Sequence, residues 1–140
     1  MPERDITLYI IDILIAVDKI KRYTKNFTSP LELLSNELEW DATIRELQII
    51  GDATNKLIKY ELINNSYRRI VSFRNQITHA YFGIDEEIVW EIVTKKLNQY
   101  HDDLNKIILS QNIDLKDAIE AAITENSHNK KVLDFLKKLL

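Results

Sequence analysis

Apolar side chains recur along most of this chain at the period of an α-helix, and little interrupts them. The first stripe alternates spacings of four and three residues, through Ile6, Ile10, Ile13, Val17 and Ile20. Such a stripe is typical of one face of an amphipathic helix. Only two glycines and two prolines are present in 140 residues, which leaves few sharp turns. The apolar–polar alternation of strands is absent from the pattern, so the sequence predicts an all-α protein.

The helical pattern divides into a bundle and an extension. Long helical segments joined by short breaks favour antiparallel packing, so we expect an antiparallel four-helix bundle over residues 1–110. Residues 111–140 form a C-terminal helical extension in this interpretation. It could brace its own bundle, extend a dimer or dock a partner. The expected helical segments are 5–25, 31–38, 41–62, 67–83, 85–107, 115–124 and 129–140.

Helix boundaries follow from the polar residues at the breaks. Short polar side chains before apolar stripes favour helix starts, here Asp41, Ser66, Asp85, Asp114 and Ser127. Gly83 is a suitable C-terminal stop for the third long helix. Gly51 falls inside the second long helix, where it costs ~1 kcal/mol relative to alanine. We expect it to allow a neighbouring helix to approach closely.

Charge and composition narrow the classes of function. The net charge of −3 argues against a general nucleic-acid coat, so any RNA contact must be local. One local basic patch exists, and it can equally be a solvated face. No cysteine is present, which excludes thiolate metal sites and suits a reducing cytoplasm. Signal-peptide and membrane-spanning patterns are not found. The candidate RNA-binding residues of the patch are Lys56, Lys59, Arg68 and Arg69, next to Arg74.

The segment from Arg74 to Tyr81 carries the most chemistry, reading Arg-Asn-Gln-Ile-Thr-His-Ala-Tyr. Arginine is a permanent forked cation suited to phosphate, and histidine moves protons near neutral pH. Arg74 beside His79 is therefore what metal-free cleavage of a phosphodiester needs, and no cofactor is expected. His101 and His128 lack convincing metal-ligand spacing, so we interpret both as surface residues.

An undistorted helix would separate the two motif groups. At about 100° per residue, Arg74 and His79 would lie about 140° apart around the helix axis. Either the helix loosens near His79, or the working site takes groups from two chains.

The motif and its surroundings resemble the HEPN superfamily, and within it the HepT toxins. Such chains carry an arginine, four to six residues, a histidine and, two residues later, a tyrosine, here Arg74, His79 and Tyr81. Residues 44–53 resemble the family's second-helix signature, and residues 88–92 resemble the start of its fourth helix. The resemblance covers roughly residues 5–110. It implies a HEPN-like bundle that dimerises, so that both motifs line one cleft.

The resemblance also implies an activity and a partner. The activity is metal-independent endoribonuclease cleavage through attack of the 2′-hydroxyl, with Arg74 and His79 as catalytic residues. Asn75 and Asp52 would support them, although HepT chains often have glutamate at the position of Asp52. The implied partner is a minimal nucleotidyltransferase antitoxin of the MntA type, in a type VII-like toxin–antitoxin pair. This antitoxin would adenylylate Tyr81 from ATP.

Two alternatives remain open at this point. The chain could be a non-catalytic HEPN binding module that docks and regulates a nucleotidyltransferase. It could also be an all-α dimerisation domain in which the motif is coincidental. A nuclease should arrest growth when expressed alone, whereas a binding module should be harmless.

Overall fold

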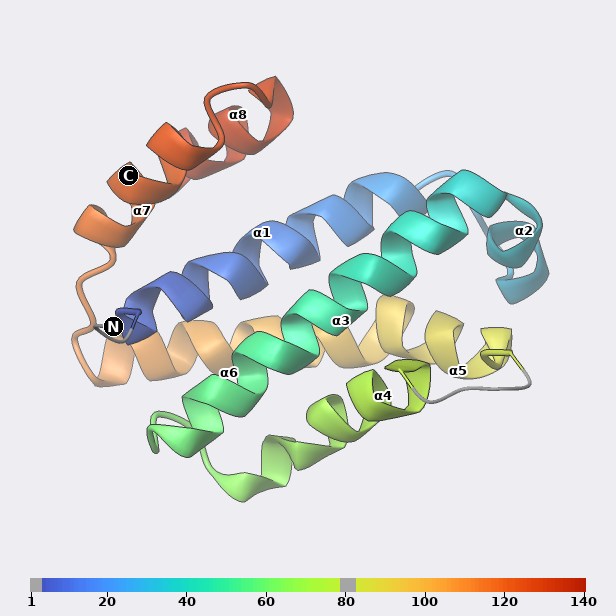
Figure 1. Cartoon of the computed structure of the whole chain (residues 1–140), viewed down its shortest axis with the longest axis horizontal. Helices are drawn as coiled ribbons and strands as arrows, with labels where there is room; N and C mark the ends of the chain where they lie inside the picture. Colours follow the sequence, from blue (N-terminus) through green and yellow to red (C-terminus); the bar gives the residue numbers. More distant parts are fainter. Residues whose placement is uncertain (1–3, 79–82) are drawn as a thin grey trace.

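Every regular element in the described part of the chain is a helix or helical turn. The computed structural model describes residues 4–78 and 83–140, without the side chains of residue 74 and residues 76–78. Within these ranges no strand occurs. Figure 1 shows long helices running alternately in opposite directions, which confirms the predicted all-α bundle.

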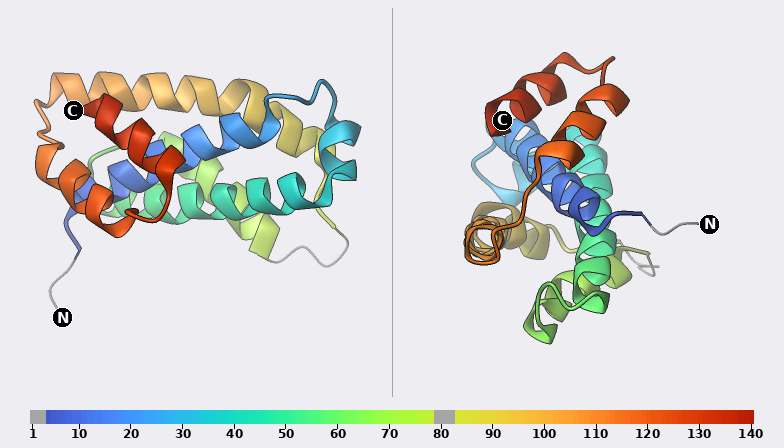
Figure 2. Two further views of the ribbon diagram at one scale, coloured as in Figure 1. Left: turned by 90° about the horizontal axis from the view of Figure 1, so that it is seen from above. Right: turned by 90° about the vertical axis from the view of Figure 1, so that its left-hand side faces the viewer.

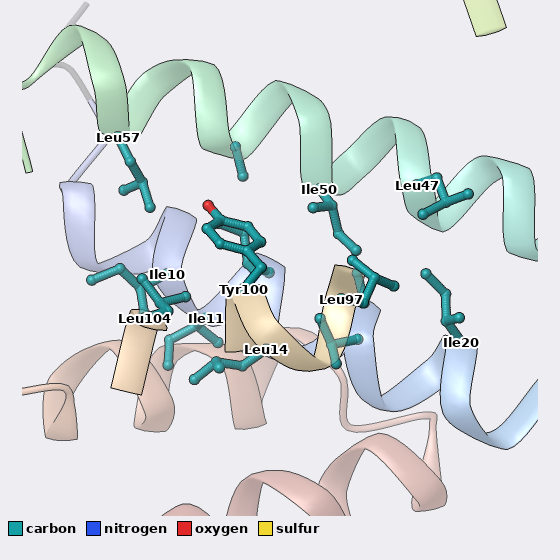
Figure 3. Close-up of a cluster of buried hydrophobic side chains, with 14 of the residues drawn as sticks. Ile10, Ile11, Leu14, Ile20, Leu47, Ile50, Leu57, Leu97, Tyr100 and Leu104 are labelled. Atoms are coloured by element: carbon teal, nitrogen blue, oxygen red, sulfur yellow. The ribbon is translucent and has the colours of Figure 1, made fainter. Parts of the chain in front are cut away.

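Helix α1 (Ile6–Thr24) lies at the centre of the molecule, and α3 (Glu37–Lys59) packs along it. Asp5 caps α1, its carboxylate accepting a hydrogen bond from the backbone amide of Thr7 at 2.9 Å. The predicted stripe of α1 is buried except for Ile6, which is half-buried, and a second apolar row that includes Ile11 and Leu14 is buried as well. A helix that is apolar on more than one side has to be covered on more than one side. Figure 3 shows side chains of α1, α3 and α6 meeting in this core.

Helix α4 (Arg68–Thr78), which carries the first part of the motif, packs against α3 at the edge of the bundle. A short 3₁₀ turn, η1 (Asn65–Tyr67), leads into it. Figures 1 and 2 place α4 on the side of α3 away from α1. Gly83 has φ +94, a conformation that favours glycine. The expected end of the helix, over residues 79–82, lies outside the described residues.

The fourth long helix contains a π turn. It consists of α5 (Glu86–Glu91), the π turn η2 (Ile92–Lys96) and α6 (Leu97–Ser110). The buried residues of this helix are Val89, Val93, Leu97, Tyr100 and Leu104. The first three of them are separated by two successive intervals of four residues. Two such spacings drift by about 80° on a regular α-helix. The wider π turn absorbs this drift and keeps the stripe on the core.

The C-terminal residues form α7 (Lys116–Glu125) and α8 (Lys130–Leu139), which pack against α1. Ile119 and Leu136 are buried in the common core. Figures 1 and 2 show these helices on the opposite side of the molecule from α4. The extension therefore packs on its own bundle, and its two other predicted roles, in a dimer or with a partner, stay predictions.

Several predicted boundaries were wrong by a few residues. The short helix α2 (Pro30–Ser35) ends early, and α3 then begins at Glu37, so Asp41 lies inside α3 rather than capping it. Acidic residues in the first turn of α3 favour this earlier start by complementing the helix dipole.

Three further predicted caps differ. Asn64 and the turn η1 precede α4, so Ser66 is not the cap of that helix. Asn129, not Ser127, caps α8, and its side chain accepts from the amide of Val132 at 3.2 Å. Asp85 caps α5 as predicted. Leu115, not Asp114, is the N-cap residue of α7. The side chain of Asp114 nevertheless accepts from the amide of Lys116 at 2.9 Å at the start of this helix.

Candidate functional site

The motif begins on α4, whose described part includes the backbone of Arg74 and all of Asn75. Asn75 is exposed. The side chain of Arg74 lies outside the described part, as do His79 and Tyr81 entirely, so the mutual geometry of these three stays a prediction. Asp52 is exposed on α3, the helix on which α4 packs.

The start of α4 is fixed to two neighbouring helices. The hydroxyl of Tyr67 donates a hydrogen bond to Oδ2 of Asp103 on α6 at 2.9 Å. The rings of Tyr67 and Tyr100 have centroids 5.3 Å apart, a distance typical of favourable aromatic pairs. Arg68 Nη1 lies 3.5 Å from Oδ1 of Asn55 on α3. The helix that carries Arg74 is therefore held at its N-terminal end.

A buried hydrogen bond lies beneath this anchor. Thr54 Oγ1 on α3 and the Tyr100 hydroxyl on α6 are 2.8 Å apart, and both residues are buried. Burial raises the pKa of Tyr100 above its ordinary value. Burial, followed by the hydrogen bond to Asp103, also raises the pKa of Tyr67. Both phenols stay protonated near neutral pH, so they position helices and do not transfer protons there.

The predicted basic patch divides between two hollows. Lys59 and Arg68 border a hollow of about 760 Å³ at the turn between α3 and α4. Arg69 borders a different groove, of about 530 Å³, between α4 and the helix formed by α5, η2 and α6. Lys56 is half-buried in the last turn of α3 and lines neither hollow. The structure thus brings Lys59 and Arg68 together and separates Arg69 from them.

The second groove contains a cation that the sequence analysis did not select. Lys96, in the π turn, lines it opposite Arg69. The sequence contained a weak signal for this residue, a lysine directly before the buried Leu97 on an amphipathic helix. Such a lysine is usually only part of a solvated face. Its place in the groove depends on how α4 and α6 are spaced.

The two remaining histidines differ in exposure. His128 is exposed, as expected. His101 is half-buried on α6, and burial, together with the charge of Lys21, lowers its pKa. Over residues 4–78 and 83–140, no group of three or more His, Cys, Asp or Glu side chains is arranged to hold a metal ion. None of the helices in these ranges has both the length and the apolar character to cross a bilayer.

Fold and site together define an all-α bundle protein whose candidate site lies on a peripheral helix with basic residues along it. The chain belongs to the Ribonuclease HepT-like family, whose sequence profile matches residues 13–107. The matched region covers α3 and α4 and ends before the C-terminal helices.

The relatives that this chain resembles include proteins with ribonuclease names. Two proteins of Methanocaldococcus jannaschii, each with a provisional RNase name, are similar over 77% of this chain. Both are 32% identical to it, and the similar region covers 91% of one and 95% of the other. A protein of Thermococcus cleftensis named "Probable ribonuclease HepT" is 28% identical over 64% of this chain and 83% of its own length. No solved structure matches the chain significantly.

Proposed function

We propose that this protein is a metal-independent endoribonuclease and the toxin component of a type VII-like toxin–antitoxin pair. The observation that carries the proposal is the family match, which spans the whole segment from Arg74 to Tyr81. The ribonuclease names of several relatives support the same class of activity. Its site of action would be the cytoplasm, where RNA and ATP are both present.

The proposed reaction is an internal phosphoryl transfer. His79 accepts the proton of a ribose 2′-hydroxyl as that oxygen attacks the adjacent phosphorus. Arg74 stabilises the negative charge that builds on the phosphoryl oxygens. The bond from phosphorus to the 5′-oxygen breaks, and that oxygen takes up a proton. The products are a 2′,3′-cyclic phosphate and a free 5′-hydroxyl, and DNA is not cleaved because it lacks the attacking group.

Two copies of the chain are proposed to form the working site. On a regular helix, Arg74 and His79 would point about 140° apart, so a single α4 would not bring them together. In a two-fold dimer with the motifs facing each other, the arginine of one copy can serve the histidine of its partner. Asn75 is proposed to hold the phosphate or the imidazole, and Asp52 to orient Arg74.

Tyr81 is proposed to be the regulatory position. A nucleotidyltransferase antitoxin of the MntA type would transfer AMP from ATP to the Tyr81 hydroxyl and release pyrophosphate. The added phosphate is anionic and the adenosine is bulky, so the modified cleft would repel and exclude RNA. Lys56, Lys59, Arg68 and Arg69 are proposed to bind the RNA backbone.

The test is cleavage of total cellular RNA by the purified, unmodified protein in excess EDTA. We expect fragments with cyclic phosphate ends. General-base catalysis contributes about 10²- to 10⁴-fold, so His79→Ala should lose at least that much activity. His128→Ala removes an exposed histidine and serves as the matched control. Arg74→Ala should be similarly inactive, and Arg45→Ala, on the exposed surface of α3, is its control.

Three outcomes would contradict the proposal. The first is intact RNA after mass spectrometry has shown that Tyr81 is free, which would favour the binding-module alternative. The second is cleavage that EDTA abolishes, which would contradict metal independence. The third is equal activity of His79→Ala and wild type, which would remove His79 from the mechanism.

A further inference from the structure

A groove runs beside the helix that carries Arg74. One wall is α4, which contributes Arg69, Ser72 and Phe73. The other wall is the helix formed by α5, η2 and α6. Four of its lining residues lie along one stripe, and each of them precedes a buried core residue by one position: Ile88, Ile92, Lys96 and Gln99. Glu91 lines the groove beside them. The groove is therefore a defined space between two helices.

The base of the groove is the bundle core. Leu47 and Ile50 of α3 and Leu97 and Tyr100 of α6 line it from below. Figure 3 shows these four side chains within the buried cluster. Their positions are fixed by packing and, for Tyr100, by the hydrogen bond to Thr54. A flat apolar ligand would meet a preformed surface there.

The two walls carry opposing cations. Arg69 is exposed on α4, and Lys96 is exposed on the π turn across the groove. Glu91 is the carboxylate among the lining residues, so the described lining is net positive. π turns often occur at functional sites, and here the π turn supplies both Ile92 and Lys96 to the wall.

We infer that this groove binds one unstacked nucleotide of the RNA, with the base over the apolar floor and its phosphates between Arg69 and Lys96. The inference rests on the proposed ribonuclease function and extends it to a substrate subsite. A volume of about 530 Å³ is within the usual range for small-molecule sites. An apolar or aromatic surface with cations beside it is the usual way of holding a single-stranded base.

Arg69 and Arg74 are five residues apart on α4, which corresponds on a regular helix to ~7.5 Å along the axis and about 140° around it. The groove therefore lies on a different side of α4 from Arg74, and it would hold a nucleotide of the same strand outside the scissile step. Gln99 and Glu91 offer a hydrogen-bond donor and an acceptor to the base edge.

The test measures binding and cleavage separately. The probe is a fluorescent RNA hexanucleotide with every 2′-hydroxyl methylated, which cannot undergo the internal attack. Its dissociation constant is measured by anisotropy over a range of salt concentrations, and its contacts are mapped by ¹H–¹⁵N NMR. Lys96→Gln is compared with Lys95→Gln, which removes an exposed charge one residue away from the groove lining. Ser72→Trp, which fills the groove, is compared with Ser110→Trp on exposed surface.

We expect Lys96→Gln to reduce the slope of log K against log salt by ~0.7, the value of one phosphate contact on a single strand. Lys95→Gln should leave the slope unchanged. Filling the groove with Ser72→Trp should weaken binding roughly 5-fold or more, because base stacking is lost. NMR shifts should concentrate on Ser72, Ile92 and Gln99 in the wild type.

Equal effects of Lys96→Gln and Lys95→Gln would overturn the inference, as would NMR shifts confined to the hollow at Lys59 and Arg68. Groove signals that shift with protein concentration alone would show that a second copy of the chain occupies it. The ribonuclease proposal and the groove inference can fail independently of each other. If the wild type binds through the groove but leaves RNA intact, the subsite stands and the nuclease does not. If the wild type cleaves RNA normally but the probe does not bind in the groove, the nuclease proposal stands and the subsite does not.

Discussion

The hydrogen bond between Thr54 and Tyr100 offers a sharp test of how the site is supported. It joins α3 to α6 inside the core, with the oxygens 2.8 Å apart. Thr54 is 0% exposed and Tyr100 is 2% exposed, so water cannot replace a missing partner. Tyr100→Phe and Thr54→Val each remove one partner with little change of shape. Each leaves the other hydroxyl buried and unpaired.

The expected cost of either single change is about 1–3 kcal/mol, the penalty for a buried unsatisfied polar group. The double variant removes both polar groups and should cost much less than the sum of the singles. We expect a coupling free energy of about 1–2 kcal/mol. Each kcal/mol should lower Tm by roughly 3–5 °C in a chain of this size.

The assay is a double-mutant cycle by urea unfolding, with thermal unfolding as a check. Asn98→Ala, at an exposed position of α6, gives the baseline for a change on that helix. Additive free energies of unfolding in the Thr54 and Tyr100 variants would refute the reasoning. That result would mean that water or another group satisfies the two hydroxyls when one is removed.

The same pair predicts a pH dependence at alkaline pH. Burial raises the pKa of Tyr100 from its ordinary value of 10.0, because the folded state favours the neutral phenol. The corresponding stability is present below about pH 10 and is lost as the pH rises through the raised pKa. Tyr100→Phe should therefore flatten the decline in unfolding free energy above pH 10. An unchanged decline would contradict this assignment.

Three further predictions concern the rest of the bundle. Leu136 on α8 is 0% exposed, so Leu136→Ala should lower the free energy of unfolding in urea by about 2–5 kcal/mol. Leu140 is 61% exposed, so Leu140→Ala should lower it little. Equal decreases for the two variants would contradict bracing by the C-terminal helices. Tyr67→Phe should cost about 1 kcal/mol and speed amide exchange in the first turn of α4. Removal of its acceptor with Asp103→Ala should have the same effect. Unchanged exchange would mean that other contacts anchor α4. Burial raises the pKa of Glu46 from 4.5, so the folded state favours the neutral acid. Glu46→Gln should therefore increase the free energy of unfolding by on the order of 1 kcal/mol at pH 7. This increase should vanish below about pH 4.5, and an equal increase at pH 4 would argue against burial as its cause.

Much of the fold could be predicted because local pattern and tertiary packing agree. The stripe of α1 and the cap at Asp85 are local signals, and both appear as expected. The start of α3 and the π turn were not predicted. The first depends on how the short α2 folds back, and the second depends on which residues the core can accept from Val89 to Tyr100.

The site was predictable in its residues but not in its arrangement. Sequence spacing identified Arg68 and Arg69 as one basic patch because they are adjacent. On a helix, adjacent side chains point about 100° apart, and in the structure these two arginines border different hollows. Lys96 lies 27 positions further along the chain than Arg69, and both residues line the same groove. The periodicity of the sequence does not predict this proximity.

The π turn is a place in the helix where evolution can change the number of residues. A wider turn holds one residue more than the α-helix it replaces. Deleting a single residue between Ile92 and Lys96 would let the segment relax into ordinary α-helix. Because seven residues of regular α-helix turn through about 700°, the later side chains of α6 would keep their orientation to within about 20°. Such a deletion would shorten the groove wall by one residue while the buried face of α6 stayed in register. An insertion or deletion here would therefore alter the proposed groove and leave the core packing of α6 in place.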